Sequence, residues 1–271
     1  MKLYRDVVVA TIAGLLAAAA PLQAQTTWNL GNFSGNTAVP NGGCAFTSAG
    51  GANGNGNVAS CSSTGSTTTS LTVTAFAFSG SLSTSTASKG SVMSWGSNGI
   101  GVCNTNEYSD CNNPNHATDN IGTFSDFVLL QFTQSTILNK VSLGWTNGDA
   151  DFTVLRWTGA GAPTVNGSSI STMLAANNWS VLGSVNGGSS GLYDLSNTTL
   201  TSNYWIVAAY NTAVNTKSGL DAGDDAFKIN RIVGTQGSPG TSTVTPEPST
   251  YALMTAGLIG IFAAARRRRQ A

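Results

Sequence analysis

The densest set of metal-binding side chains lies in the segment 104–126. It carries four carboxylates, those of Glu107, Asp110, Asp119 and Asp126. The asparagines between them add amide oxygens, and hard cations such as Ca²⁺ bind carboxylate and carbonyl oxygens. The segment therefore predicts a calcium site, with a spacing that does not match an EF-hand loop. The alternative is that these aspartates only form turns, where Asp side chains usually hydrogen-bond to the backbone.

Two later segments are further candidates for cation binding. Asp149 and Asp151 lie on one face of the chain if this stretch is extended. Asp221, Asp224 and Asp225 come in a turn before the last predicted strand. Each segment provides oxygen ligands of the kind that Ca²⁺ prefers.

Catalytic chemistry has little support in the sequence. A serine hydrolase would have to use His116, the only histidine, as its base. A glycosidase would need Glu107 and an aspartate facing each other across a cleft, and the sequence favours no such pair. Cys103, Cys111 and His116 could be imagined as zinc ligands, but their spacing fits no familiar zinc module. We therefore expect a domain that is not an enzyme.

The sequence pattern predicts that the elements that position these residues are short strands. Apolar and aromatic runs alternate with turn residues rich in Gly, Ser, Thr and Asn, a composition typical of strands and turns. Eight or more strands at this spacing predict an all-β domain over residues 25–240, a β-sandwich or jelly-roll-like fold. Residues 171–177 could form one or two helical turns. The predicted strands are 71–78, 92–95, 127–132, 141–145, 152–157, 179–185, 204–210 and 227–233.

The predicted strand 71–78 has an unusual pattern. Its large apolar residues change parity after Val73, which predicts either a bulge or a strand that changes the face it buries. The Ser/Thr/Gly-rich stretches 60–70 and 79–91 on either side of it are expected to be exposed. All six tryptophans lie in or beside predicted strands, so we expect most of them to pack in the core.

Charge is sparse in this domain. Once both terminal segments are set aside, six basic and ten acidic residues remain, a net charge near −4. Nucleic-acid binding needs a basic face, and this composition does not provide one.

The N-terminus has the features of a secretory signal peptide over residues 1–24. Lys2 and Arg5 precede an apolar run from 7 to 20, and Ala24 is a plausible last residue before cleavage by signal peptidase. Export to an oxidising compartment predicts that the four cysteines form two disulfides. Three pairings are possible, and short loops favour Cys103 with Cys111 and Cys44 with Cys61.

The C-terminus, residues 245–271, reads as a sorting signal. Its parts are the triplet Pro246, Glu247 and Pro248, the apolar segment 251–265, and the arginines Arg266, Arg267, Arg268 and Arg269. Residues 252–265 would form a helix only about 21 Å long, which is short for a bilayer core of about 30 Å. This short C-terminal transmembrane helix therefore suits transient anchoring in the inner membrane, with the arginines on the cytoplasmic side.

This tail resembles the PEP-CTERM signal, which exosortases of Gram-negative bacteria recognise and process. The patches 101–122, 144–159 and 221–229 also resemble a family of exosortase-dependent surface proteins, over about residues 92–235. The resemblance implies exosortase and signal peptidase as processing partners. It also implies a place in the cell envelope, on the cell surface or in the extracellular matrix, and it transfers no catalytic residue.

We therefore expect an exported cell-surface or extracellular-matrix protein with a non-catalytic structural or adhesive role. A calcium-assisted carbohydrate-binding module that binds extracellular polysaccharide is the first alternative. A secreted hydrolase is the second.

Overall fold

A computed structural model describes residues 25–34, 40, 42–47, 56–64, 69–82, 84–105, 107, 111, 116–175 and 178–236. The predicted signal peptide and the predicted sorting signal lie outside the described residues. Within the described ranges, no helix is both long enough and apolar enough to cross a membrane.

Strands dominate the described residues, and the helical elements are short. The helical elements are η2 (Gly96–Asn98) and α2 (Ile170–Ala175). The strands are β1 (Gln25–Asn29), β2 (Cys44–Phe46), β3 (Val58–Thr64), β4 (Ser70–Ser79), β5 (Ala87–Lys89), β6 (Ser91–Ser94), β7 (Ile100–Cys103), β8 (Thr118–Asp119), β9 (Phe124–Thr146), β10 (Phe152–Trp157), β11 (Trp179–Val185), β12 (Gly191–Asp194), β13 (Thr201–Ala209) and β14 (Ala226–Gln236).

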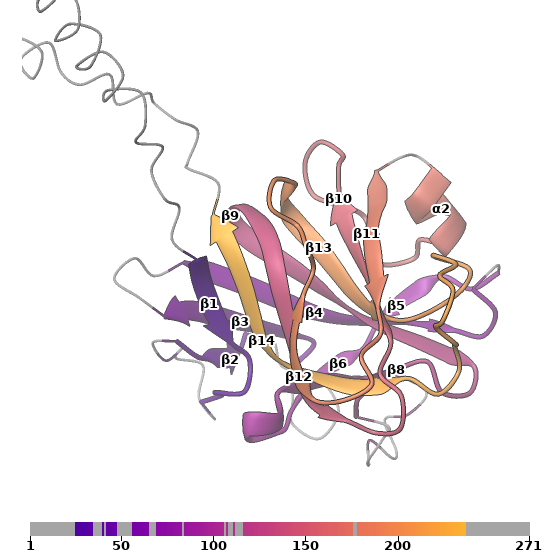
Figure 1. Ribbon diagram of the computed structural model, residues 1–271, viewed down its shortest axis with the longest axis horizontal. Coiled ribbons are helices and arrows are strands. Elements are labelled where there is room, and N and C mark those ends of the chain that lie inside the picture. The colour runs from indigo at the N-terminus through magenta and orange to yellow at the C-terminus, as the bar shows by residue number, and fades with distance from the viewer. Residues whose placement is uncertain are drawn as a thin grey trace, which may run out of the picture. The chain divides into compact units, whose positions relative to one another are not determined.

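The strands form one 14-stranded sheet that closes on itself through the long strand β9. The first half of β9 pairs with β4 and its second half pairs with β14. Strands β3 and β1 complete the circuit, because β4 pairs with β3, β3 with β1, and β1 with β14. On the other side of β9, the strands β13, β10 and β11 extend the sheet toward α2 (Figure 1). The all-β class is confirmed. The finer expectation of a β-sandwich or jelly roll stays a prediction, because the described strands hydrogen-bond into a single sheet rather than two.

Two hydrophobic cores lie on opposite faces of this sheet. The larger one receives side chains from all five strands of the circuit, among them Trp28, Leu71 and Phe132. The smaller one lies on the other face of β4, β9, β10 and β13, where α2 covers it with Ile170 and Met173. Because neighbouring strand residues point to opposite faces, the central strands are apolar on both sides.

This double burial explains the parity change in β4. Leu71, Val73 and Ala75 belong to the larger core, whereas Phe76 and Phe78 belong to the smaller one. The pairing of β4 with β9 continues without a register shift, so no bulge is present there. The pattern allowed a bulge or a strand that changes the face it buries, and β4 does the latter at its C-terminal end.

Most predicted strands are present, with two corrections. The predicted strands 127–132 and 141–145 are parts of the single strand β9. The stretches 60–70 and 79–91, expected to be exposed, contribute residues to β3 and to β5, and both Ser63 and Ala87 are buried. The short helix expected within 171–177 is confirmed as α2.

Candidate functional site

Three of the four predicted calcium ligands lie near enough to repel one another. Asp119 ends β8, Asp126 lies near the start of β9, and Glu107 follows β7. Asp119 and Asp126 are buried, and Glu107 is half-buried. Asp110 lies outside the described residues.

Burial raises the pKa of all three carboxyl groups. The pKa of Glu107 rises to about 7. That of Asp119 rises to about 8, with a contribution from the nearby Glu107. The pKa of Asp126 rises well above its usual range through burial and the repulsion of Asp119 and Glu107. Neither carboxylate oxygen of Asp126 accepts a hydrogen bond of normal geometry, although Asn104 lies near enough to lower its pKa. Burial thus favours the protonated form of all three groups, and a calcium site here stays a prediction.

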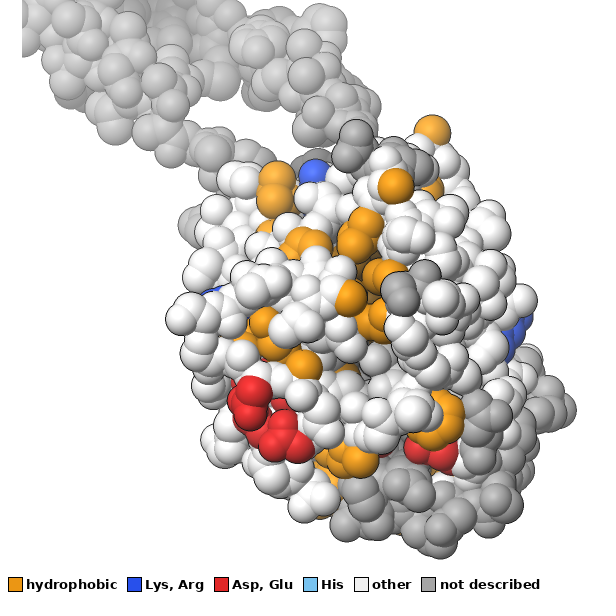
Figure 2. Space-filling model, turned by 90° about the vertical axis from the view of Figure 1, so that its right-hand side faces the viewer, with side chains coloured by type: hydrophobic (Ala, Val, Ile, Leu, Met, Phe, Trp, Pro, Cys, Tyr) orange, Lys and Arg blue, Asp and Glu red, His pale blue; other side chains and the backbone are white. Residues whose placement is uncertain are grey.

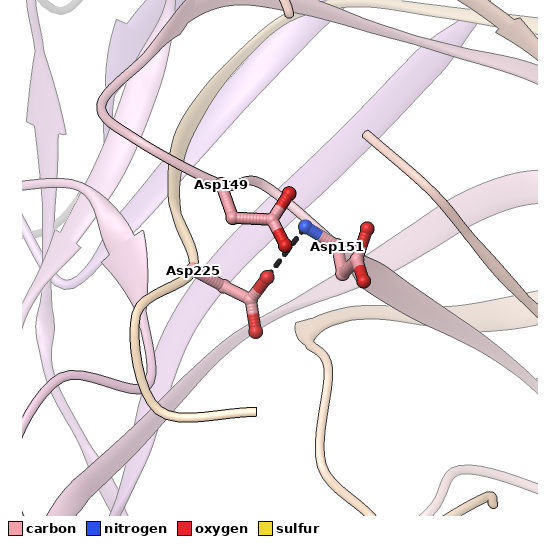
Figure 3. Close-up of side chains that lie close together, drawn as sticks. All are labelled: Asp149, Asp151 and Asp225. Carbon is pink, nitrogen blue, oxygen red and sulfur yellow. Dashed lines mark hydrogen bonds between the residues drawn. The ribbon is translucent and has the colours of Figure 1, made fainter. Parts of the chain in front are cut away.

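A more compact set of carboxylates lies where two loops meet. Asp149, Asp151 and Asp225 each place a carboxylate oxygen within 4.8 Å of the others (Figure 3). Asp149 also forms a second group of this compactness with the exposed Asp221 and Asp224. Asp149 and Asp151 follow β9, whereas the three aspartates at 221, 224 and 225 precede β14. Acidic side chains also gather near the lower edge of the face shown in Figure 2.

The backbone brings these two loops together. The carbonyl of Asp149 accepts a hydrogen bond of 3.0 Å from the amide of Ala226, and the amide of Tyr210 donates to the carbonyl of Asp151 at 3.0 Å. Gly148 precedes them with a φ of 73°, a left-handed conformation that favours glycine. The sequence showed 149–151 and 221–225 as separate candidates, and the structure joins them.

Hydrogen bonds hold the buried members of this set in place. One carboxylate oxygen of Asp225 accepts from the amide of Asp151 at 2.6 Å, and the other accepts from the side chain of Asn120. Asp151 accepts through Oδ1 from the amide of Gly187 at 3.1 Å, whereas its buried Oδ2 has no hydrogen-bond partner. Burial raises the pKa of Asp225 to about 8 and that of Asp151 to about 6, and nearby carboxylates add to both shifts.

The segment at β8 contributes to both carboxylate sets. Asp119 belongs to the set with Glu107 and Asp126, whereas the next residue, Asn120, bonds to Asp225. Successive residues of an extended segment point to opposite sides, which explains this division. Sequence reasoning missed Asn120, because one asparagine among many gives no signal of a partner about a hundred residues away.

The only histidine takes part in an aromatic stack. The ring of His116 lies 3.9 Å from that of Trp95 between centroids. The ammonium of Lys228 lies 3.8 Å from the ring centroid of Trp145 and 5.2 Å from that of Trp95. Burial lowers the pKa of Lys228 to about 8. Trp95 itself is 42% exposed, whereas Lys228 and His116 are buried.

The letters Gly-Gly-Ser-Ser-Gly at 187–191 fit the Gly-x-Ser-x-Gly pattern of serine hydrolases. The segment connects β11 to β12, so it lacks the strand-to-helix turn of a nucleophile elbow. Ser189 is exposed, and its amide donates a hydrogen bond to the hydroxyl of Tyr193. The pattern here therefore belongs to a strand-to-strand loop.

Both disulfides join the cysteines that the sequence favoured. Cys44 and Cys61 are bonded across the pair β2 and β3, where they lie opposite each other. Cys103 and Cys111 are bonded around the loop that carries Glu107. The zinc alternative needs free thiols at 103 and 111, and the disulfide leaves none.

A polar groove of about 670 Å³ is lined by residues of β9, β10 and β13 and of the loop after β10. Its lining includes the half-buried rings of Trp157 and Tyr204, and the polar side chains of Gln131, Arg156 and Asn203. Arg156 donates a hydrogen bond to the carbonyl of Thr201 at 3.2 Å, which holds its guanidinium at the groove. Aromatic rings beside amide and guanidinium groups are able to bind sugars, whose faces stack on rings and whose hydroxyls form hydrogen bonds.

Comparison with known proteins concerns the C-terminus. The chain matches no curated protein and no solved structure. Residues 244–269 match the PEP-CTERM protein-sorting motif, as the triplet at 246–248 and the four arginines predicted. The chain thus carries an exosortase-directed sorting signal, which marks it as a protein exported to the cell envelope of a Gram-negative bacterium.

Proposed function

We propose that the exported domain serves on the cell surface or in the extracellular matrix as a non-catalytic structural or adhesive module. The observation that carries this proposal is the PEP-CTERM motif that follows an all-β domain with two disulfides. Disulfides suit the oxidising space outside the inner membrane. A closed sheet with its strands paired around β9 suits a stable domain that displays its loops.

The surroundings of the most reactive side chains support a non-catalytic role. His116 is buried and stacks on Trp95, so its ring is held by packing. Ser189 lies in a loop between strands rather than in a strained elbow. The carboxylates of Asp119 and Asp126 are buried, and Asn104 lies beside Asp126.

A deletion strain tests this role directly. Cells that lack the protein should lose cohesion or surface adhesion, and the wild-type gene should restore it. A variant with His116→Gln, which keeps a planar polar side chain at this buried position, and Ser189→Ala should restore it equally well, because neither group takes part in a reaction. Turnover of an ester or polysaccharide by the purified protein, abolished by those substitutions with the fold intact, would support the hydrolase instead.

A second candidate function is carbohydrate binding at the groove. The rings of Trp157 and Tyr204, beside the donors of Arg156 and Asn203, favour it. Affinity electrophoresis in gels that contain the producing strain's own exopolysaccharide tests this function. The wild type should be retarded, and Tyr204→Ala should reduce the retardation at least threefold. Unchanged mobility of the wild type, or equal retardation of the variant, would exclude the groove as a polysaccharide site.

A further inference from the structure

We propose that Asp149, Asp151 and Asp225 bind one Ca²⁺ ion, with Asp221 and Asp224 at the solvent side of the site. The ion would tie the loop after β9 to the loop before β14. The sequence favoured a different set of residues, Glu107, Asp110, Asp119 and Asp126.

The geometry of the carboxylates suits a hard cation. Oxygens of Asp149, Asp151 and Asp225 lie within 4.8 Å of one another, which is the separation of two ligands on opposite sides of an ion bound at 2.3–2.6 Å. Asp149 is also within this distance of the exposed Asp221 and Asp224. A flexible coordination shell of six to eight oxygens is typical of Ca²⁺, whereas Mg²⁺ needs a rigid octahedron.

A buried oxygen without a partner points to a ligand. Asp151 is 0% exposed, its Oδ1 accepts from the amide of Gly187, and its Oδ2 accepts no hydrogen bond from the described residues. A buried carboxylate oxygen left in this state costs free energy, since buried polar groups are normally satisfied. Its carboxylate belongs to the compact set with Asp149 and Asp225 (Figure 3). A cation in that set would supply the missing partner.

No basic side chain neutralises this set among the described residues. Their one ion pair joins Lys140 to Asp194. Lys217 lies in the same loop as Asp221, but its ammonium donates to the carbonyl of Ser184 at 2.5 Å. Three to five carboxylates without a counterion repel one another, and a divalent cation would remove that repulsion.

Calcium titration of the purified full-length protein in detergent, followed by calorimetry and by Tm, tests the proposal. The wild type should bind about one ion with a Kd of about 1 mM or tighter, a range typical of extracellular modules. Saturating Ca²⁺ should raise Tm by at least about 5 °C relative to EGTA, because the ion binds only the folded state.

Three isosteric variants locate the ion. Asp151→Asn and Asp149→Asn should each weaken binding at least tenfold, whereas Asp126→Asn should bind like the wild type. Asp149 is half-buried, so its variant decides the question if Asp151→Asn does not fold. The proposal is overturned if the wild type binds no Ca²⁺ at millimolar concentration, or if Asp149→Asn binds as tightly as the wild type. Loss of binding in Asp126→Asn would place the ion in the other set and would also overturn it.

Discussion

Two hydrogen bonds join Asn120 to Asp225, although 105 residues separate them in the chain. The side-chain amide of Asn120 donates to the carboxylate of Asp225, and its Oδ1 accepts from the backbone amide of Asp225 at 2.9 Å. The side-chain nitrogen of Asn120 also donates to the carbonyl of Tyr210 at 2.7 Å. One buried asparagine thus joins the segment after β8 to both ends of the loop between β13 and β14.

Removing the hydrogen bonds of the Asn120 side chain should destabilise the domain. We expect Asn120→Ala to lower the free energy of unfolding by about 2–3 kcal/mol, because it removes one of the hydrogen bonds to the buried carboxylate of Asp225 and the side-chain partner of two backbone groups. Urea unfolding followed by tryptophan fluorescence measures the change. Asn166 is exposed, so Asn166→Ala should stay within about 0.5 kcal/mol of the wild type. Equal stability of the two variants would contradict a stabilising role for the hydrogen bonds of Asn120.

The disulfide between Cys44 and Cys61 should contribute measurably to stability. It closes a loop of 17 residues, so replacing both cysteines with alanine should cost about 3 kcal/mol of unfolding free energy. Urea unfolding under oxidising conditions gives the value. The difference should disappear when both proteins are measured in dithiothreitol. A double variant as stable as the oxidised wild type would contradict this prediction.

Stability should fall as pH rises from about 5 to 8. Burial raises the pKa of Glu107 and Asp119 to about 7 and 8, and it raises that of Asp126 well above its usual range. The folded protein then holds protons that the unfolded chain has released above about pH 4. The stability that these protonated groups contribute is therefore complete below pH 4, and it is lost as pH rises through their folded pKa values.

Asp126→Asn tests this pH dependence, because the amide keeps the shape of the side chain and cannot ionise. We expect it to raise the free energy of unfolding at pH 8 by at least about 1 kcal/mol and to flatten the pH profile of Tm. Measurements in EGTA separate this effect from calcium binding. Asp194 is exposed, so Asp194→Asn should leave the slope between pH 5 and 8 unchanged. A profile for Asp126→Asn that runs parallel to the wild type would rule the explanation out.

The sorting motif should determine the mature C-terminus. Intact-mass analysis of protein recovered from the cell surface should show that residues 266–269 have been removed. Replacing Pro246, Glu247 and Pro248 with alanine should leave the full-length chain in the membrane fraction, because exosortase would no longer recognise it. Surface protein that retains its four arginines would indicate a permanent tail anchor.

Local patterns in the sequence predicted much of the fold, because the evidence for them is contained in short segments. The alternating runs at 152–157 and 179–185 coincide with β10 and β11. Strands β1 and β3 were missed because their sequences are rich in Ser, Thr and Gln rather than in large apolar residues. These two strands complete the closed circuit, so the sequence could not show that the sheet closes.

The sequence by itself determined the sorting signal and the all-β class, and it favoured the local disulfide pairs, since each depends on residues that are close together in the chain. Tertiary structure alone decided which carboxylates meet. Asp151 and Asp225 are 74 residues apart, and they approach because strand pairing brings the loop after β9 against the start of β14. It also decided that Asp126 is buried beside Asp119, because long-range pairing sets the surroundings of a side chain and thereby its pKa.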